Sequence, residues 1–570
     1  MLSVIKKCGK ITCYAKKLKN YAALIRRNKS DFLSSSYPTI EIPNVIVPEF
    51  VFESFDKYPN KVAVECDFTG KKYTFDEIRL KSRNLNTNLR KKLNLKKGDV
   101  IAIILPNVAD YPICVFGALQ AGLVVTTINP SYKSGEISRQ LLDCNAKAIV
   151  TLSSLYNTVQ EILTDAKISI PILTVKTKIS STTPSGAIDL NEFSQTKQDV
   201  SDTVEIHPKD VALLLYSSGT TGLSKGVQHT HQSIVANICQ TNTEEFKFYP
   251  DRSETYENKV LSILPWFHIY GIVAILFNQL RLLTKLICIQ KFTPESFIDM
   301  LIKHKPTCLH LVPQLILFIT NNPLIKSEFL QPVSTVIYGS APLSETNINA
   351  FLNKINRKIN LVNGYGLTET IAVCYTSKTS IAKGYFGTMG LFANTSLKIV
   401  SPENCNLSLG VNQKGEILVK GPQVMKCYHN RETETKNAFV DGWYITGDLG
   451  YYDEKGFVYI TDRLKNIIKV NSFQVAPTEL EDIIRGFKDV EDTAVIGIPD
   501  EQYGEVPLAF VVPVPNKKLN INDLQKYVST KVVKYKQLKG GVIVVDSLPK
   551  NATGKILRND LLIMYKNQML

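Results

Sequence analysis

One loop constrains the fold of this chain more than any other segment. The sequence YSSGTTGLSKGV at Tyr216–Val227 follows the apolar run Val211–Leu215, which is typical of a buried strand. Glycines let a backbone approach an anion closely, and hydroxyls and a lysine can bind phosphate oxygens. The spacing differs from the GxxxxGK[ST] phosphate loop, because Gly226 follows Lys225 where that motif has Ser or Thr. The segment predicts a strand followed by a phosphate-binding loop, although such runs also occur in plain flexible loops.

Length and composition predict a globular chain of two or more domains. The chain has 570 residues, which exceeds the size of a single core, and 44% of them are hydrophobic. The longest apolar region, residues 261–289, contains His268, Asn278, Arg281 and Lys285, so it lacks the uninterrupted apolar length of a membrane span. Eleven cysteines without a CxxC pair favour reduced thiols over a disulfide framework or a zinc site.

The net charge of +15 is concentrated at the N-terminus. Residues 1–30 hold nine Lys and Arg and no acid, and the 58 basic residues of the remainder face 52 acidic ones. Residues 31–570 therefore carry only a small net positive charge, and they contain no basic patch interleaved with aromatic residues. Both features argue against nucleic-acid binding. We assign residues 1–36 as a leader, in which six apolar side chains share one helical face. They are Val4, Ile11, Ala15, Leu18, Ala22 and Ile25.

A basic, acid-free amphipathic leader predicts a mitochondrial transit peptide. Lys outnumbers Arg in the leader and Ser is scarce before Ser30, so a membrane-surface helix or a disordered tail is the alternative. The last four residues, Asn567–Leu570, are not a peroxisomal signal of the SKL type. We therefore expect mitochondrial localisation, with the cytoplasm as the alternative and the peroxisome less favoured.

The apolar pattern predicts an α/β fold. From about residue 50 to 460, short β-branched runs alternate with helical patterns, as in Val100–Leu105 followed by Asp110–Ala121. Such alternation is typical of layers with largely parallel strands. Two polar stretches, 180–207 and 248–259, predict surface loops. The pattern changes to short strands and glycine turns at 415–459, which predicts a small β-rich subdomain.

A separate C-terminal unit begins near Arg463. Its pattern predicts an α+β lid with helices over 477–487 and 521–533 and strands over 493–498 and 506–513. The predicted domains are therefore the leader 1–36, an N-terminal domain 37–462 and the lid 463–570.

Six further segments accompany the glycine loop, each a weak signal alone. They read ILPWFHIYG at 263–271, VIYGSAPLS at 336–344, NGYGLTET at 363–370, DGWYITGDLG at 441–450, DRLKNIIKVNSFQVAPTELE at 462–481 and LPKNATGKILR at 548–558. In this order they resemble the adenylate-forming enzymes of the acyl-CoA synthetase and luciferase superfamily, and within it the 4-coumarate–CoA ligase-like branch. The resemblance runs from about Tyr37 to the C-terminus.

The resemblance implies a large N-terminal α/β domain with a β-rich subdomain, a small mobile lid and a two-step reaction. A carboxylate attacks the α-phosphate of ATP to give acyl-AMP and pyrophosphate, and the thiol of coenzyme A then displaces AMP. It implies ATP, Mg²⁺ and coenzyme A, with a small-molecule carboxylic acid as the partner and no transmembrane segment. An apolar acyl wall suits a 4-coumarate-like aromatic acid or a medium-chain fatty acid equally.

The resemblance also assigns residues to the nucleotide. Those expected to bind ATP or AMP are Ser217, Ser218, Gly219, Thr220, Thr221, Lys225, Gly339, Ser340, Ala341, Tyr365, Gly366, Thr368, Asp448, Arg463 and Gln474. Tyr365 would stack on adenine, and Asp448 with Arg463 would bind the ribose, with a plain ion pair as the alternative. Glu369 would ligate Mg²⁺ through its hard oxygen, or else be a carboxylate favoured by a helix N-terminus.

Three residues are assigned catalytic roles and one a hinge. Lys555 would face the α-phosphate and stabilise the transition state electrostatically by several kcal/mol. The alternative is that Lys555 is an ordinary solvated lysine on the surface. His268 would line the acyl pocket, or else be a satisfied core histidine. Lys465 falls at the hinge position of the lid, and Lys469 would serve the coenzyme A step.

The acyl and coenzyme A sites complete the assignment. The expected acyl wall consists of His268, Tyr270, Gly271, Leu311, Val312, Ile371, Ala372 and Val373. Asn471 and Ser472 would border the coenzyme A tunnel, where relatives place a glycine. Gln232 and Cys427 also depart from the pattern, at positions usually held by Lys and Gly. These departures concern the thioester step and leave the adenylation set intact.

Other functions are separable by sequence features. A luciferase-like oxygenase shares every motif. A non-catalytic ATP- or acyl-binding relative would lack Lys555, Glu369 or Asp448, and all three are present. A peptide-synthetase loading domain would need a carrier domain, and no residues are expected for one after Leu570.

Overall fold

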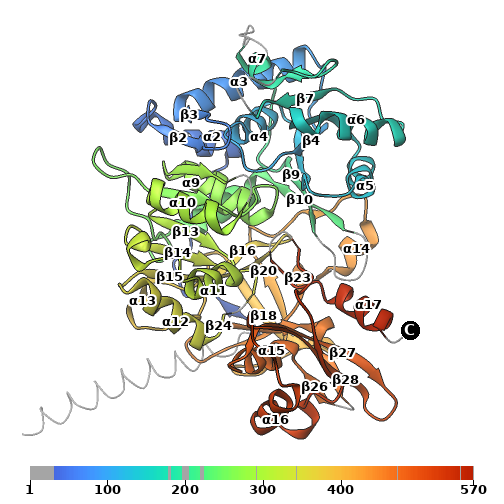
Figure 1. Cartoon of the computed structure of the whole chain (residues 1–570). Coiled ribbons are helices and arrows are strands. Elements are labelled where there is room, and N and C mark those ends of the chain that lie inside the picture. The colour runs from blue at the N-terminus through green and yellow to red at the C-terminus, as the bar shows by residue number, and fades with distance from the viewer. Residues whose placement is uncertain are drawn as a thin grey trace, which may run out of the picture.

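The structure, a computed structural model, describes residues 31–177, 182–195, 204–217, 224–289, 292–341, 343–470, 473–551 and 554–568. It consists of a large N-terminal body and a small C-terminal unit beneath it, drawn in orange to red in Figure 1. The expected α/β class with a separate α+β lid is confirmed. No helix among the described residues is long and apolar enough to cross a membrane. All nine cysteines of the described part are free.

The first sheet carries the glycine loop. Its strand order is β21 (Cys427–Tyr428), β10 (Lys225–Thr230), β9 (Val211–Ser217), β5 (Val124–Thr127), β4 (Val100–Ile104), β6 (Ala146–Leu152), β7 (Ile172–Val175) and β8 (Ile188–Asp189). Strands β9 to β8 run parallel, and β10 turns back antiparallel on β9 after the loop. The β9 run predicted from sequence is therefore the strand that delivers Ser217 to the edge of the sheet.

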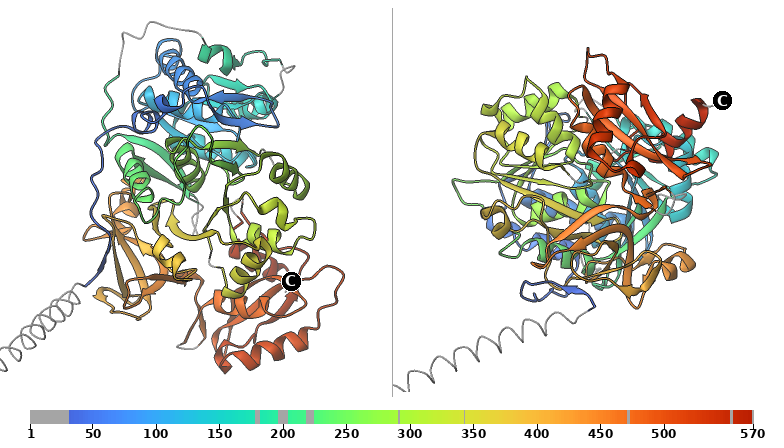
Figure 2. Two further views of the ribbon diagram at one scale, coloured as in Figure 1. Left: turned by 90° about the vertical axis from the view of Figure 1, so that its left-hand side faces the viewer. Right: turned by 90° about the horizontal axis from the view of Figure 1, so that it is seen from below.

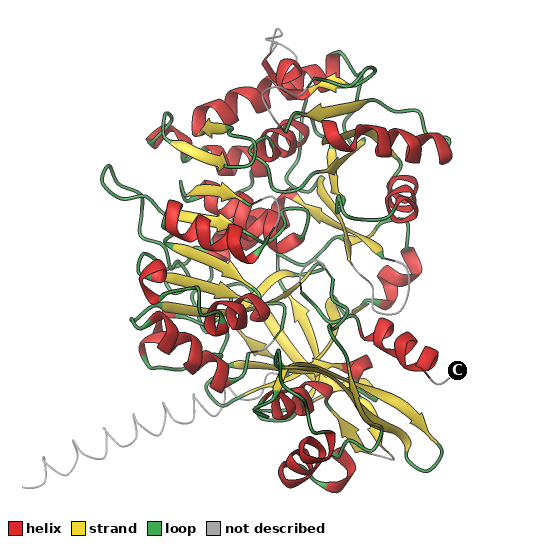
Figure 3. Cartoon of the chain, viewed as in Figure 1, coloured by secondary structure: helices red, strands yellow, loops and turns green. Residues whose placement is uncertain are grey.

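Helices cover both this sheet and the next one (Figure 3). They are α2 (Val47–Phe52), α3 (Phe75–Lys91), α4 (Tyr111–Gln120), α5 (Ser134–Cys144), α6 (Tyr156–Asp165), α7 (Leu190–Gln195) and α8 (His231–Thr241). The sequence predicted α4 and β4 to within a residue or so of their ends. The expected loop at 180–207 is wrong in part, because β8 and α7 form within it and bury Leu190 and Phe193.

The second sheet packs beside the first and supplies most of the central site. Its order is β17 (Gly390–Leu391), β16 (Ile371–Tyr375), β15 (Asn360–Leu367), β14 (Thr335–Tyr338), β13 (Cys308–Leu311), β11 (Lys259–Ser262), β12 (Lys285–Cys288), β2 (Val62–Cys66) and β3 (Lys72–Thr74). Its helices are α9 (Asn278–Arg281), α10 (Pro294–His304), α11 (Pro313–Asn321), α12 (Glu345–Ile355) and α13 (Lys378–Ala382). A π-helix, Tyr270–Phe277, begins within the last two residues of the ILPWFHIYG segment.

The β-rich subdomain is larger than the sequence indicated. It joins β1 (Leu33–Ser34), β18 (Ser396–Ser401), β19 (Asn404–Ser408), β20 (Gly415–Lys420), β22 (Phe439–Val440), β23 (Trp443–Tyr452) and β24 (Val458–Arg463), with α14 (Glu432–Asn437) beside it. Because β1 pairs with β18 and Phe32 packs on Trp443, the folded body begins before residue 37. The leader of 1–36 is therefore a few residues too long.

The lid has its own sheet and core. Strands β25 (Ile468–Val470), β26 (Phe473–Val475), β27 (Val490–Asp500), β28 (Gly504–Pro513) and β29 (Gly541–Val544) pack against α15 (Pro477–Arg485) and α16 (Ile521–Lys531), and α17 (Arg558–Gln568) ends the chain. All four lid elements predicted from sequence are present. The left view in Figure 2 shows the lid beside the β-rich subdomain and below the body.

Candidate active site

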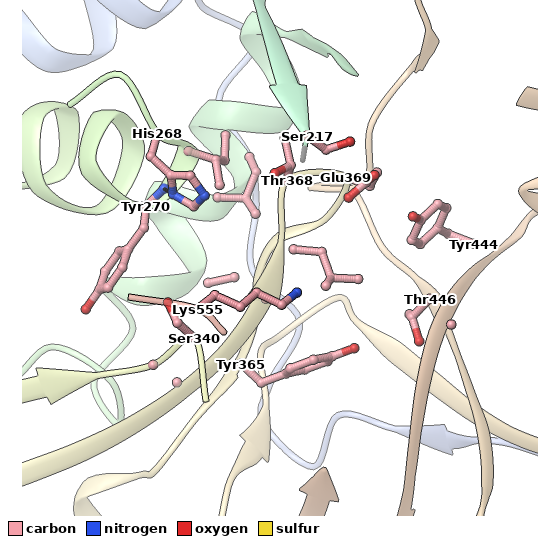
Figure 4. Close-up of a pocket in the computed structure, with 18 of the residues that line it drawn as sticks. Ser217, His268, Tyr270, Ser340, Tyr365, Thr368, Glu369, Tyr444, Thr446 and Lys555 are labelled. Carbon is pink, nitrogen blue, oxygen red and sulfur yellow. Dashed lines mark hydrogen bonds between the residues drawn. The ribbon is translucent and has the colours of Figure 1, made fainter. Parts of the chain in front are cut away.

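A cavity of about 390 Å³ lies where the two large sheets, the β-rich subdomain and the lid meet. Figure 4 shows it from within, with Tyr270 on one side, Glu369, Tyr444 and Thr446 on the other, and Lys555 between them. Of the residues assigned from sequence, it is lined by Ser217, Lys225, His268, Tyr270, Gly339, Ser340, Tyr365, Gly366, Thr368, Glu369, Ile371, Ala372, Arg463 and Lys555. Segments more than 300 residues apart thus converge on one space.

The lid contributes Lys555 to this cavity. Its loop is anchored on the body, because the Gln314 side chain donates a 2.8 Å hydrogen bond to the carbonyl of Gly554. Within the loop, the Lys555 backbone N–H donates to Asn551 Oδ1 at 2.8 Å. Burial and the nearby Arg463 guanidinium lower the pKa of Lys555 to about 8, against the opposing influence of Asp448 and Glu369. The lysine is therefore still charged at neutral pH, in a site where its charge is poorly screened.

Glu369 is held by neighbours that the motifs did not include. The Tyr428 hydroxyl donates to Glu369 Oε1 at 3.1 Å, and Tyr444 lies 3.4 Å from the same hydroxyl. The ammonium of Lys225 lies 5.0 Å from the centre of the Tyr428 ring, which is cation–π range. Strand β21 therefore connects the glycine loop to the carboxylate.

The turn before Glu369 rests on a buried histidine. His229 Nε2 lies 2.7 Å from the carbonyl of Thr368, and burial lowers the pKa of His229 to about 4. A neutral ring that faces a carbonyl must carry its proton on that nitrogen, so Nε2 donates the hydrogen bond. This contact fixes the backbone that carries Thr368 and Glu369.

Tyr365 and Arg463, which line the cavity, form one cluster with the buried Asp448 behind them. The Tyr365 hydroxyl donates to Asp448 Oδ2 at 2.7 Å, and Arg463 Nε lies 2.9 Å from Oδ1. Burial raises the pKa of Asp448, and Arg463 opposes this rise. The carboxylate lies behind Tyr365 rather than on the cavity surface, but each oxygen can accept a further hydrogen bond.

His268 faces the cavity as a neutral ring. Burial, with a smaller contribution from the Lys555 charge, lowers its pKa to about 4. The backbone N–H of Tyr270 donates to His268 Nδ1 at 3.3 Å, so the ring proton is on Nε2. In this arrangement His268 offers an N–H donor and not a free base.

Two cavity residues have left-handed backbones. Ser340 has φ of 77° and Ile371 has φ of 53°, and for a β-branched residue such a value is a genuine outlier. The carbonyl of Ile371 comes so near Gly366 that a side chain there would clash with it. Strain of this kind gathers at ligand sites, and no sequence pattern indicated it here.

Several assigned residues lie elsewhere. Two residues expected in the acyl wall, Val373 and Gly271, do not line the cavity. Val373 packs in the core with Met389 and Leu391, and Gly271 is buried against the backbone of Pro265. Of the other wall candidates, Leu311 is in a different core cluster and Val312 is buried beside Gly554 without lining the cavity.

The remaining assignments fall on exposed or undescribed positions. Ala341, Lys465 and Lys469 are exposed. Loss of hydration and the charges of Arg463 and Lys555 nevertheless lower the pKa of Lys465 to about 8. Ser218, Gly219, Thr220, Thr221, Asn471, Ser472 and the Gln474 side chain lie outside the described part of the chain.

Comparisons with known proteins place the chain among adenylate-forming enzymes. Residues 51–429 match the family model described as AMP-binding enzyme, and 479–555 match the AMP-binding enzyme C-terminal domain. The chain is 35% identical to rice 4-coumarate–CoA ligase 3 over 92% of its own length and 94% of the relative. It is 33% identical to the probable 4-coumarate–CoA ligase 1 of Dictyostelium discoideum, covering 94% of this chain and 98% of that one. The crystal structure of ATP-bound MatB from Rhodopseudomonas palustris superposes with a TM-score of 0.80 at 27% identity, covering 92% and 99% of the two chains.

Proposed function

Because the chain belongs to the AMP-binding enzyme family, in its 4-coumarate–CoA ligase-like branch, we propose that it joins a hydrophobic carboxylic acid to coenzyme A. The AMP-forming ligation itself is the activity of the branch to which the comparisons assign the chain. Our proposal concerns the acid, the metal and the residues that act. The observation that carries it is one cavity lined by the lid lysine Lys555, by Glu369 and by an apolar wall.

Adenylation brings two anions together, the carboxylate and the polyphosphate, and the cavity has cationic side chains that would reduce their repulsion. Ser217 and Lys225 line it at the two described ends of the glycine loop, where they would bind the β- and γ-phosphates. Lys555 lies between these residues and the acyl side, where it would face the α-phosphate as negative charge builds on it. The neutral His268 presents an N–H toward the same space, which would orient the carboxylate before attack.

Glu369 fits the role of a magnesium ligand. Its Oε1 accepts from Tyr428, and Oε2 accepts none of the hydrogen bonds found within the described residues, so a hard oxygen is left facing the cavity. Mg²⁺ bound there would neutralise phosphate charge and help to align the reacting groups. Tyr428 and the His229-supported turn would hold the carboxylate in place for it.

The acyl side supports a hydrophobic acid. Ala274, Ile337, Ile371 and Ala372 line it, and the charged lining residues Lys225, Glu369, Arg463 and Lys555 belong to the nucleotide side of our assignment. An aromatic propenoic acid or a medium-chain fatty acid fits this lining, and the second would place the enzyme in fatty acid metabolism.

The thioester step requires the lid to move. Lys555 lines the cavity in which acyl-AMP would form, while Lys469 is exposed on the lid and does not line that cavity. Rotation about the exposed Lys465 would withdraw Lys555 and bring another lid face to the acyl-AMP. The Gln314–Gly554 hydrogen bond and the 3.0 Å bond from Thr478 Oγ1 to Asp462 hold the lid in its present position.

Products identify the reaction. Purified protein given ATP, Mg²⁺, coenzyme A and a hydrophobic acid should form AMP, pyrophosphate and acyl-CoA in equal amounts, measured by chromatography over a panel of aromatic and aliphatic acids. The matched control is Lys555→Ala, which should lower the rate about 10²–10³-fold because it removes the charge facing the α-phosphate. Release of ADP and phosphate would contradict the proposal.

The pH dependence should report the charge of Lys555. Because the lowered pKa of about 8 belongs to the ammonium form, the charge is present below pH 8 and is lost as pH rises through it. We expect kcat/KM for ATP to fall above about pH 8, and the corresponding limb in kcat to lie at higher pH because bound phosphate favours the ammonium.

Substitution by arginine separates Lys555 from Lys465, whose pKa is likewise lowered to about 8. Lys555→Arg keeps a charge at all accessible pH values and should abolish the limb, whereas Lys465→Arg should retain it. An unchanged limb in Lys555→Arg would show that another group titrates.

We also propose that the leader directs the protein to mitochondria. The nine basic residues before Ser30 would be drawn inward by the membrane potential, and they precede Phe32 and β1, which are part of the folded body. Residues 1–30 fused to a fluorescent reporter should colocalise with mitochondria. The control fusion changes Lys6, Lys10 and Lys17 to Glu and should stay diffuse; a diffuse signal from the natural leader would refute the targeting role.

A further inference from the structure

The loop that carries Lys555 is closed at its base by backbone pairing. Lys550 and Ile556 form an antiparallel β-bridge across it, and the backbone N–H of Leu557 donates to the carbonyl of Pro549 at 2.9 Å. The two arms of the loop therefore leave the lid side by side. Since the loop reaches from the lid into the cavity, the place of the Lys555 ammonium depends on what holds this base (Figure 4).

Each end of the loop has a cation that binds a carboxylate of the lid. Before the loop, Lys550 Nζ donates to Oδ2 of Asp492 on β27 at 2.6 Å. After the loop, Arg558 Nη2 donates to Oε1 of Glu481 on α15 at 2.6 Å, and its Nε donates to the carbonyl of Val495 at 3.3 Å. The loop is thus attached at both ends by charge-assisted hydrogen bonds, which are stronger than neutral ones.

Arg485 joins the two carboxylates to each other. Its Nε donates to Asp492 Oδ1 at 3.3 Å, and its Nη2 lies 3.9 Å from Glu481 Oε2. Along the path from Lys550 through Asp492, Arg485 and Glu481 to Arg558, positive and negative side chains alternate. The two ends of the Lys555 loop therefore belong to one ion network, which is anchored on α15 and β27.

Burial makes this network more than a set of surface ion pairs. The Glu481 side chain is only 4% exposed, and its Oε1 accepts a second hydrogen bond, from the backbone N–H of Val495 at 2.9 Å. Charges this far from water are poorly screened. Removal of one partner would leave an uncompensated charge, which is strongly unfavourable in a buried network. The arrangement therefore favours one position of the loop base over others.

We propose that Glu481 and Asp492 are positioning residues for Lys555: through Arg558 and Lys550 they fix the base of its loop, and with it the place of the ammonium in the cavity. This inference rests on the proposed ligase function. Neither carboxylate is among the described residues that line the cavity, so an effect on adenylation would pass through Lys555. Misplacement of a reacting group by about 1 Å can cost about 10²-fold in rate.

Single turnovers of the two half-reactions test the role of Glu481. Glu481→Gln should lower acyl-AMP formation about 10- to 100-fold. Thioester formation from preformed acyl-AMP should stay within about twofold of wild type, because Lys555 is expected to act only in the first step. Glu479→Gln is the matched control: it lies on the same helix and pairs with Lys536 at 2.6 Å, away from the loop, so both half-reactions should be unchanged. A purely structural role for Glu481 would lower both half-reactions together.

A double variant shows whether Glu481 acts through the lysine. In the Lys555→Ala background, Glu481→Gln should change acyl-AMP formation by less than about twofold, because the group that it positions is already absent. If the two losses multiply, Glu481 acts independently of Lys555 and the inference is wrong.

Variants of Lys550 test the other end of the loop. Lys550→Met removes the donor to Asp492 and should slow acyl-AMP formation alone, whereas Lys550→Arg keeps a donor and should stay closer to wild type. Equal rates in the two variants would refute the role of Asp492.

The outcomes separate this inference from the function on which it rests. If the wild-type protein forms no acyl-AMP from any acid, the ligase proposal fails and this inference fails with it. If wild type forms acyl-AMP and Glu481→Gln matches it, or loses both half-reactions equally while folded by circular dichroism, only the inference is overturned. Should Glu481→Gln not fold, Lys550→Met decides, since its side chain is 24% exposed and the same selective loss is required of it.

Discussion

The site depends on one lysine that comes from a different folding unit than the cavity it enters. Placing an ammonium in a half-buried space is unfavourable, as the lowered pKa of Lys555 records. The position is maintained by contacts that do not involve the charge, chiefly Gln314 to Gly554 and Thr478 to Asp462. A bound phosphate would stabilise the ammonium of Lys555, because it supplies negative charge that the protein itself provides only partly, through Asp448 and Glu369.

This imbalance gives the lid a physical reason to move. While a polyphosphate is present, the ammonium is stabilised in the cavity; once pyrophosphate leaves, much of that stabilisation goes with it. The contacts named above are hydrogen bonds, each of which contributes only about 1–3 kcal/mol. A lid held this lightly can rotate when the charge that favoured its position departs.

The sequence predicted the parts of the site that lie within single segments. The glycine loop, the NGYGLTET segment and the Lys555 loop were assigned from the order of several segments, most of them weak signals alone, and Ser217, Lys225, Thr368, Glu369 and Lys555 line the cavity. His229, Tyr428 and Tyr444 were missed, since their roles arise from contacts between strands that only the fold brings together.

The acyl wall shows a second reason for failure. The three consecutive residues Ile371, Ala372 and Val373 were all expected in the wall. A regular strand would place Ile371 and Val373 on one face of β16, but the positive φ of Ile371 and the irregular register against β15 break this alternation. Ile371 and Ala372 therefore line the cavity and Val373 enters the core. The π-helix after His268 is likewise invisible to a 3.6-residue pattern, yet it sets the direction of Tyr270.

The most direct test of the central role of Lys555 is to measure the two half-reactions of Lys555→Ala separately in single turnovers. Acyl-AMP formation from ATP and acid should fall by about two to three orders of magnitude, while thioester formation from preformed acyl-AMP and coenzyme A should remain within about twofold of wild type. Equal losses in both half-reactions would contradict the account, because they would mean that Lys555 stays in the cavity throughout and that the lid does not exchange one face for another.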